Sequence, residues 1–144
     1  MRVYEVMSKD IETVRPAVRA SEARTRMRQK KVHHLVVTQG AELQGVVSER
    51  DLGGPKLPKV LGTWTVGDLM TSPVVTVTTR TPIRRAAALM KGRSIGSLIV
   101  TSPNGKVAGI VTVADLLNVL ARTAEHASNR ALRKAREERG WEPD

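Results

Sequence analysis

Cysteine is absent from this chain of 144 residues, and aromatic side chains are scarce: there are two Trp, one Tyr and no Phe. The first absence excludes disulfide bonds and thiolate metal sites, and it is compatible with a reducing compartment. The second means that the core is built from Val, Leu, Ile, Met and Ala. No apolar run approaches the roughly 20 residues of a membrane span, and the N-terminus lacks the apolar segment of a signal peptide. The expected localisation is cytoplasmic.

Positive charge is in excess. The formal net charge is +10, of which residues 121–144 carry only +1, with six basic against five acidic residues. The excess therefore belongs to the body of the protein, where it favours anionic partners such as nucleotides, nucleic acid or an acidic protein surface.

The chain repeats itself. At an offset of 63 residues, identical residues recur at Val3/Val66, Met7/Met70, Thr13/Thr76, Val14/Val77, Ala23/Ala86, Met27/Met90, Leu35/Leu98 and Val37/Val100. One extra residue enters the second copy in the turn 102–105, and the register then continues to Leu52 and Leu116. Chance would not keep one register across half a chain, so the two copies are a true repeat. We therefore divide the chain into repeat 1 (1–52), a linker (53–64), repeat 2 (65–121) and a charged helical tail (122–144).

Each repeat has the pattern β-α-β-β-α. Extended segments are expected at 11–14 and 74–77, and apolar strands at 35–37, 43–48, 98–100 and 107–112. In repeat 2, Thr81 suits the N-cap of the first helix and Pro82 its first position. The fold class is α+β: two small mixed sheets with helices, packed as a pseudo-twofold pair, plus a C-terminal helical extension.

The last helix of each repeat has a different expected length. After Asp51 it should be brief, because Gly53, Gly54, Pro55 and Pro58 break it. After Asp115 nothing breaks the helix before Gly140, and an apolar stripe runs along it through Leu117, Leu120, Ala124, Ala127, Ala131 and Ala135. This stripe could pack on the body of the protein or on a partner subunit, and docking on the body is the simpler expectation.

The end of each repeat carries a motif that suits phosphate binding. Residues 45–51 and 109–115 both read Gly, two apolar residues, Ser or Thr, two variable residues, and Asp. The strand delivers a hydroxyl to a helix N-terminus, where free N–H groups favour a phosphate, and the carboxylate can accept two bonds from ribose hydroxyls. Gly45 and Gly109 would let a flat base approach the backbone.

The same motif has a purely structural interpretation. Ser or Thr followed three residues later by an acid is also a helix-capping arrangement, and for one isolated motif capping is the more common role. Two motifs, each after a Gly-initiated strand in matching repeats, favour binding.

The two repeats resemble a tandem pair of cystathionine-β-synthase (CBS) domains, also called a Bateman module, over residues 2–121. Repeat 1 is similar to those of the gamma subunit of AMP-activated protein kinase, because the run Val32-His33-His34-Leu35-Val36-Val37 precedes its motif. The resemblance implies that Asp51 and Asp115 hold ribose hydroxyls, that Ser48 and Thr112 face the α-phosphate, and that His33 and His34 lie along the phosphate path. Arg50, inside the first motif, is a further candidate.

The resemblance also implies that each site borrows residues from the other repeat. Thr71 and Val74 would line the Asp51 site, and Ser8 and Ile11 the Asp115 site, each site being its own cleft. Gly96 and Ser97 replace the His pair in repeat 2, so the Asp51 site is favoured for a charged nucleotide unless Arg93 reaches into the other.

Plainer interpretations of the basic residues stay open. The His pair could lie in a solvated turn or pack in the core; metal binding is the least favoured, since adjacent strand residues point to opposite faces. The run Arg24, Arg26, Arg28, Lys30 and Lys31 is typical of the solvated side of a helix.

The predicted function is a stand-alone regulatory module that binds AMP, ADP, ATP or S-adenosylmethionine and signals by a conformational or oligomeric change. A homodimer, an unknown effector protein, no cofactor beyond this regulatory ligand and no membrane are expected. Nucleic-acid binding and pure dimerisation are the alternatives, although the chain lacks the aromatic platforms of single-strand binders. An enzyme is not expected, because no nucleophile–base pair or P-loop is present.

Overall fold

The computed structural model describes residues 1–53 and 63–140. Its elements follow in the order η1 (Val3–Glu5), β1 (Thr13–Val14), α1 (Ala20–Lys30), β2 (His34–Gln39), β3 (Glu42–Ser48), α2 (Val66–Leu69), β4 (Thr76–Thr78), α3 (Ile83–Arg93), β5 (Ser97–Thr101), β6 (Val107–Thr112) and α4 (Val113–Glu138). Most of the predicted linker, including Gly54, Pro55 and Pro58, lies outside the described residues.

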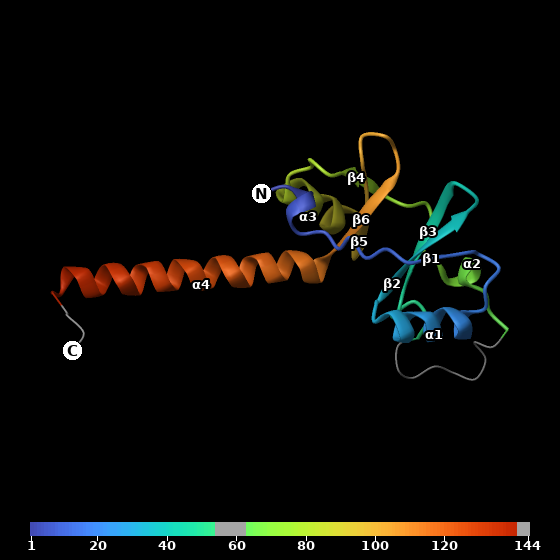
Figure 1. Cartoon of the computed structure of the whole chain (residues 1–144), viewed down its shortest axis with the longest axis horizontal. Helices are drawn as coiled ribbons and strands as arrows, with labels where there is room; N and C mark the ends of the chain where they lie inside the picture. Colours follow the sequence, from blue (N-terminus) through green and yellow to red (C-terminus); the bar gives the residue numbers. More distant parts are fainter. Residues whose placement is uncertain (54–62, 141–144) are drawn as a thin grey trace.

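Two three-stranded sheets carry the fold (Figure 1), in the orders β1-β2-β3 and β4-β5-β6. In each sheet the first pair of strands is parallel and the second antiparallel. The registers correspond as well, since Val37 pairs with Gly45 and Val100 pairs with Gly109. The predicted α+β class and the two mixed sheets are confirmed.

The N-terminal segments of the two repeats are exchanged between them. Val3 donates its N–H to the Thr81 carbonyl (2.8 Å), and Ser8 and Ile110 bond each other in both directions (2.9 and 3.0 Å). In the same way Val66 donates to Val18 (2.8 Å) in the other half. The start of repeat 1 therefore packs on repeat 2, and the start of repeat 2, including the short helix α2, packs on repeat 1.

Burial follows this exchange. One core cluster contains Leu35, Val47 and Leu52 of repeat 1 together with Val66 from the start of repeat 2. The other contains Leu98, Val100 and Val111 of repeat 2 together with Val3 from the start of repeat 1. The first cluster consists of residues 14, 20, 23, 27, 35, 37, 47, 52 and 66. The second consists of residues 3, 77, 86, 90, 98, 100 and 111. Val3 and Val66 are completely buried, as expected for anchors of a core that has no aromatic ring.

A third apolar cluster joins the two sheets. It is formed by Val36, Val46, Ile99 and Ile110, one residue from each of the four strands β2, β3, β5 and β6. Because alternate strand residues point to opposite faces, each sheet uses one face for its own helices and the other for this seam. The seam holds the repeats in one body.

The helices α1 and α3 end alike, and α3 begins differently from the prediction. Both terminate in a left-handed residue, Lys31 (φ 56°) and Ser94 (φ 53°). The N-cap of α3 is Pro82 and not Thr81. Thr81 instead accepts the Thr78 N–H through Oγ1 (3.1 Å), so its hydroxyl closes the preceding turn.

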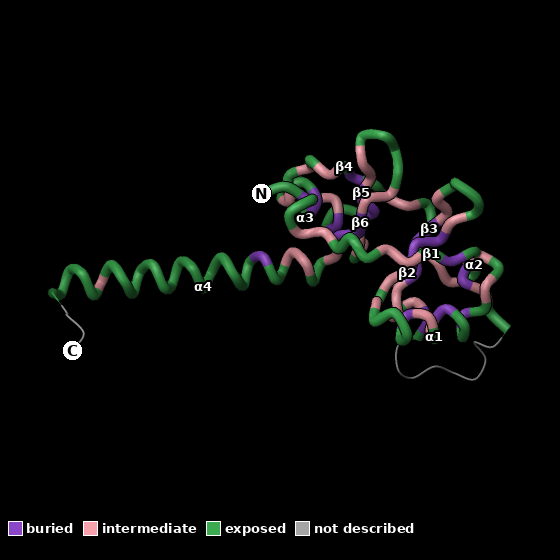
Figure 2. The backbone as a smooth tube through the Cα atoms, in the orientation of Figure 1, coloured by how far each residue is buried: buried purple, intermediate pink, exposed green. Residues whose placement is uncertain are grey.

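The final helix α4 begins at Thr112, the N-cap, and runs without a break through residue 121 to Glu138. It leaves the body and projects into solvent (Figures 1 and 2). Val119 is its single buried residue within the described helix. Docking of the Ala stripe on the body, the simpler expectation, is therefore wrong. None of the described helices is long and apolar enough to cross a membrane.

Candidate functional site

The two Gly-to-Asp motifs form reciprocal hydrogen bonds at the ends of β3 and β6. Asp51 Oδ2 accepts the Ser48 N–H (2.9 Å), and Ser48 Oγ accepts the Asp51 N–H (3.0 Å). Asp115 Oδ2 accepts the Thr112 N–H (2.8 Å), and Thr112 Oγ1 accepts the Asp115 N–H (3.3 Å). Both motifs are thus capping arrangements, but each uses only one carboxylate oxygen among the described residues.

A third capping arrangement shows what this geometry does elsewhere. Thr65 and Asp68 make the same pair of bonds at the start of α2, with Asp68 Oδ2 accepting the Thr65 N–H (2.9 Å). The Thr65 hydroxyl also donates to Asp68 Oδ2 (3.0 Å). The two bonds that Thr65 donates lower the pKa of the exposed Asp68 carboxyl, and the backbone N–H has the larger effect. Capping alone therefore does not distinguish the candidate site; its surroundings do.

The Asp51 and Asp115 motifs face one groove of about 1290 Å³. All eleven residues that the sequence proposed lie along it: Ser8, Ile11, His33, His34, Ser48, Arg50, Asp51, Thr71, Val74, Thr112 and Asp115. Asp68 is not among its lining residues. The expectation of two separate clefts is wrong, because the strands that end at Ser48 and Thr112 lie on either side of the seam and open into the same space.

The floor of the groove is apolar and its rim is charged. Val46 and Ile110 of the seam line it, together with Ile11 and Val74, which pack against the same cluster. The charged residues along it are Lys9, Asp10, Glu12, Lys30, Lys31, Glu49, Arg50, Asp51 and Asp115. An apolar floor with a few convergent polar groups is the usual construction of a small-molecule site.

His33 and His34 have different environments. His33 is mostly exposed and its Nδ1 lies 2.7 Å from Glu49 Oε2. His34 is half-buried on β2 opposite Ser48. Burial lowers the pKa of His34 below 6.5 and neighbouring His33 adds to this, while Asp51 and Asp115 oppose it. His34 therefore interacts electrostatically with the Asp at each end of the groove, whereas His33 lies at the Asp51 end, beside Glu49.

The two ends of the groove differ in their hydrogen-bond donors. Thr112 Oγ1 donates to Asp115 Oδ2 (3.0 Å), which uses its only hydrogen. Ser48 Oγ has no acceptor among the described residues. Gly96 and Ser97 line the groove where the His pair stands in repeat 1, and Arg93 is not among the lining residues. The Asp51 end is thus richer in donors and in basic groups.

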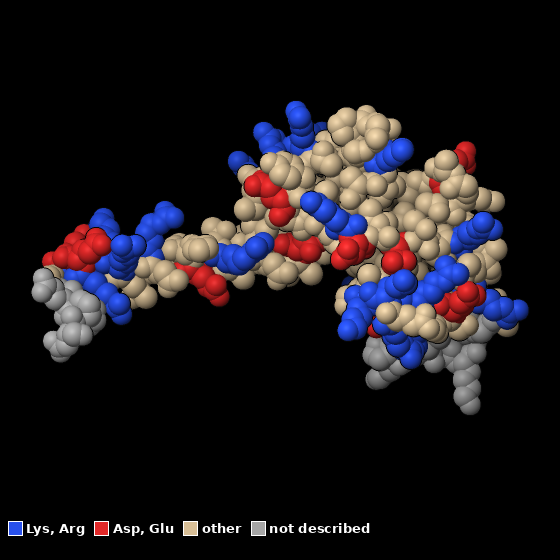
Figure 3. Space-filling view, in the orientation of Figure 1, with Lys and Arg blue, Asp and Glu red and all other residues tan. Residues whose placement is uncertain are grey.

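Basic residues at the end of α1 also line the groove, although the sequence did not indicate them as site residues. Lys30 and Lys31 line the groove, and Arg24, Arg28 and Lys31 line a smaller adjoining hollow of about 280 Å³ that also reaches His33. Lys and Arg side chains gather over this helix (Figure 3). The signal was present in the basic run before His33, which we interpreted as a solvated helix face.

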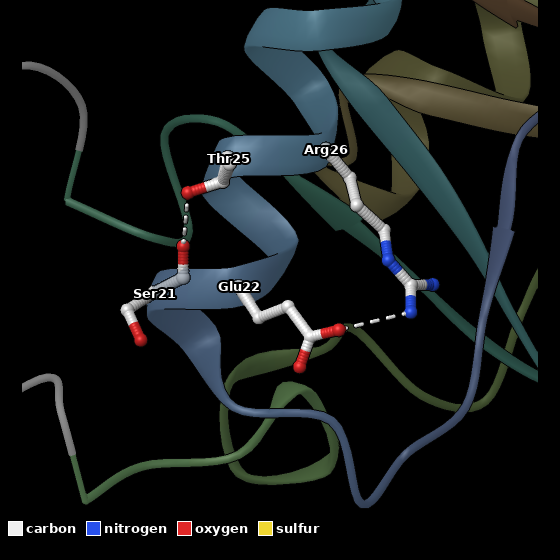
Figure 4. A network of polar contacts seen from close by, with 4 residues as sticks. All are labelled: Ser21, Glu22, Thr25 and Arg26. Carbon is white, nitrogen blue, oxygen red and sulfur yellow. Dashed lines mark hydrogen bonds and ion pairs between the residues drawn. The ribbon is translucent and has the colours of Figure 1, made fainter.

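Part of that interpretation holds. On the same helix Arg26 pairs with Glu22 (3.1 Å), and Thr25 Oγ1 donates to the Ser21 carbonyl (3.1 Å), as Figure 4 shows. These contacts are ordinary exposed helix chemistry of small energetic weight. Arg26 is therefore a surface residue, and the groove is reached only by the residues nearer the end of the helix.

Gly45 and Gly109 admit protein backbone, which corrects the expectation that they admit a base. A Cβ on Gly45 would lie 2.7 Å from the Thr71 carbonyl oxygen, and one on Gly109 would lie 2.6 Å from that of Ser8. Both glycines are needed where the exchanged segments cross β3 and β6. The described residues contain no cluster of three His, Asp or Glu side chains that could hold a metal ion.

Two matching β-α-β-β units, exchanged at their N-terminal segments and sharing one groove at their seam, define a tandem-repeat module. The CBS domain family model matches residues 3–52 and 66–122, one repeat each. The chain belongs to the CBS domain family.

Known proteins agree with this assignment. The chain is 33% identical to an uncharacterized protein of Methanopyrus kandleri, over 81% of this chain and 61% of that protein, so it spans about three fifths of that relative. The CBS domain pair of protein MJ0100, solved with 5′-methylthioadenosine and S-adenosyl-L-methionine, superposes with a TM-score of 0.73 at 23% identity, covering 85% of this chain and 98% of the other. The cytosolic domain of the Mg²⁺ channel MgtE with ATP has a TM-score of 0.62 at 28% identity, covering 79% and 46%.

Proposed function

We propose that the groove binds an adenosine-containing ligand and that the Asp51 end takes a charged nucleotide such as AMP, ADP or ATP. The observation that carries this proposal is the convergence of both motifs, with all eleven candidate residues, on one groove of about 1290 Å³. Solved structures similar to this chain hold S-adenosyl-L-methionine, 5′-methylthioadenosine or ATP.

The second oxygen of each carboxylate supplies the ribose contact in this proposal. Oδ2 of Asp51 is held by the Ser48 N–H, so Oδ1 accepts from the vicinal hydroxyls. The Ser48 hydroxyl, which has no acceptor among the described residues, donates to the α-phosphate. His34, Lys30 and Lys31 then lie on the path of the phosphates, and the apolar seam residues Val46 and Ile110 contact the base.

Signalling requires that the ligand bind two states of the module with different affinity. The groove is lined by both repeats, so a ligand that touches both favours one arrangement of the seam. We propose that an effector protein in the cytoplasm reads this arrangement, with the module as a binding protein and not a catalyst.

The test is nucleotide binding by calorimetry with AMP, ADP, ATP and S-adenosylmethionine, on Asp51→Asn, Asp115→Asn and Asp68→Asn. All three aspartates cap a helix or turn in the same way, but only the first two face the groove, which makes Asp68→Asn the matched control. We expect Asp51→Asn to weaken nucleotide binding about tenfold or more, a loss of about 1.4 kcal/mol, with Asp68→Asn unchanged.

Two results would overturn the proposal. If no adenosine compound binds wild type at millimolar concentration, the module is a dimerisation or nucleic-acid-binding unit. Equal weakening by all three variants would mean that the aspartates act through folding. Weakening by Asp115→Asn alone would move the site to the other end of the groove.

A further inference from the structure

The helix α4 presents an apolar stripe to solvent. Val113, Leu117 and Leu120 are 43%, 59% and 64% exposed, and the stripe continues through Ala124, Ala127 and Ala131, all exposed. With 26 residues α4 is about 39 Å long, and beyond its first two turns it has no neighbour among the described residues (Figure 2). A helix that lacks tertiary packing is only marginally stable in water, so a stripe of this length calls for a partner.

The spacing of the stripe identifies another helix as that partner. From Val113 to Ala131 its members are separated alternately by four and three residues: 113, 117, 120, 124, 127 and 131. Ala135 follows after four residues and does not continue this spacing. The alternation is the heptad spacing of a helix that packs along its whole length against one other helix. Helix faces that pack on a broad globular surface have a wider apolar face than this.

We propose that α4 pairs with α4 of a second copy of this chain in antiparallel orientation. The sizes of the stripe residues favour this, because Leu117 and Leu120 lie at the body end and only Ala at the far end. An antiparallel pair sets Leu120 against Ala131 of the second copy and Ala124 against its Ala127, so the apolar contact runs from Leu120 to Ala131 of each helix. A parallel pair would set Leu against Leu at one end and leave a gap between Ala residues at the other.

Charge favours the same orientation. Residues 113–125 carry one Arg and two acidic residues, a net charge of −1, whereas residues 126–138 carry four basic residues and two Glu, a net charge of +2. Antiparallel pairing places the positive half beside the negative half of the second copy, and parallel pairing would place the two positive halves together. The helix dipoles also favour antiparallel pairing, because it places the positive end of each helix beside the negative end of the other.

An anionic membrane is the competing partner for a helix with basic residues on its polar side. Helices that lie in a membrane interface commonly insert Trp, Phe and Leu. The distal half of the α4 stripe is Ala, and the whole helix lacks an aromatic residue. Ala gives little apolar area to lipid but allows a close approach of two helices, so the second copy is favoured.

Sedimentation equilibrium of the full chain tests the pairing, with Leu120→Glu against Leu132→Glu as the matched control. Both leucines are exposed on α4, 64% and 58%, but Leu132 lies off the stripe, so neither change disturbs the body. We expect Leu120→Glu to raise the dissociation constant about 100-fold or more, since both copies lose a buried Leu, and Leu132→Glu to leave it within about threefold of wild type. Equal masses for all three proteins at every concentration would overturn the proposal.

Spin-label distances test the orientation, and the absence of native cysteine makes each label unique. Asn118→Cys, Glu125→Cys and Leu132→Cys lie one heptad apart on the same side of α4. An antiparallel pair gives the shortest intermolecular distance at 125, with the label sites at 118 and 132 offset along the axis by about 21 Å. Three equal distances would refute the antiparallel arrangement, and sedimentation of a monomer with phosphatidylserine vesicles would identify a membrane as the partner. Neither experiment depends on nucleotide binding.

Discussion

Replacing Gly45 with Ala places a methyl group where the exchanged segment crosses β3. The new Cβ would lie 2.7 Å from the Thr71 carbonyl oxygen and 2.7 Å from Met70 Sδ. The Met70 side chain can rotate away. The Thr71 backbone cannot, because it is tied to Val46 by hydrogen bonds of 2.8 and 3.2 Å.

The cost follows from these contacts. Overpacking of this kind costs about 1–3 kcal/mol, and loosening the two Thr71–Val46 bonds adds about 1 kcal/mol, so Gly45→Ala should lose about 2–4 kcal/mol of unfolding free energy. For a chain of this length that corresponds to a fall in Tm of about 6–12 °C. Gly109→Ala should behave alike, since its Cβ would meet the Ser8 carbonyl oxygen at 2.6 Å.

Thermal unfolding followed by circular dichroism measures this fall, and Gly92→Ala is the control. Gly92 lies in α3 with nothing within 4 Å of an added Cβ. Ala there should add about 0.5–1 kcal/mol to the unfolding free energy through its higher helix preference, and so raise Tm slightly. If Gly45→Ala and Gly92→Ala shift Tm alike, the crossing of Thr71 over β3 is not the tight contact described here.

Three other outcomes are expected. The bonds from Thr65 lower the folded pKa of Asp68, so the ionised carboxylate stabilises the fold above pH 3.8, and this contribution disappears as pH falls through the folded pKa. The urea unfolding midpoint of Asp68→Asn should therefore depend less on pH below 3.8 than that of wild type. Parallel curves for the two proteins would contradict the Thr65 bonds. Burial lowers the folded pKa of His34 below 6.5, so the imidazole takes up a proton more readily in the unfolded chain, and the unfolding free energy falls as pH drops below 6.5. His34→Gln should make the unfolding free energy less dependent on pH in this range. An NMR titration midpoint above 6.5 for His34 would refute the lowering of its pKa by burial. Glu49→Gln should change the unfolding free energy by less than about 0.5 kcal/mol, because the pair of Glu49 with His33 is exposed. The same change should tighten ATP binding several-fold, because it removes a negative charge from the proposed path of the phosphates. Weaker ATP binding in calorimetry would instead assign Glu49 a direct role in binding.

The sequence predicted the strands and helices whose positions depend on neighbouring residues along the chain. The strands around Leu35 and Leu98 are short apolar runs bounded by turns, and both lie where expected. The long helix after Asp115 was also predicted, because no Gly or Pro interrupts it before Gly140. The start of α3 was misplaced by one residue, since Thr81 bonds to the turn before the helix instead of capping it.

The interactions between distant segments could not be predicted in this way. The pairing of Ser8 with Ile110 joins residues about a hundred positions apart, and no periodicity indicates it. The two motif glycines were assigned to a ligand because the exchanged backbone that fills their space was unknown. The Ser and Thr hydroxyls and the Asp carboxylates of the two motifs were proposed from their pattern, and the residues borrowed between repeats from the family resemblance. Lys30 and Lys31 were not proposed, because a basic helix end has the same composition whether or not a groove lies beside it.

The exchange of N-terminal segments means that the duplication boundary in the sequence is not a boundary of folding units in space. A fragment ending at residue 52 would lack Val66, and one beginning at residue 65 would lack Val3, so each would leave a hole in its apolar centre. The halves are thereby obliged to fold and unfold together. A ligand that binds one end of the groove would therefore stabilise the far half as well as the near one.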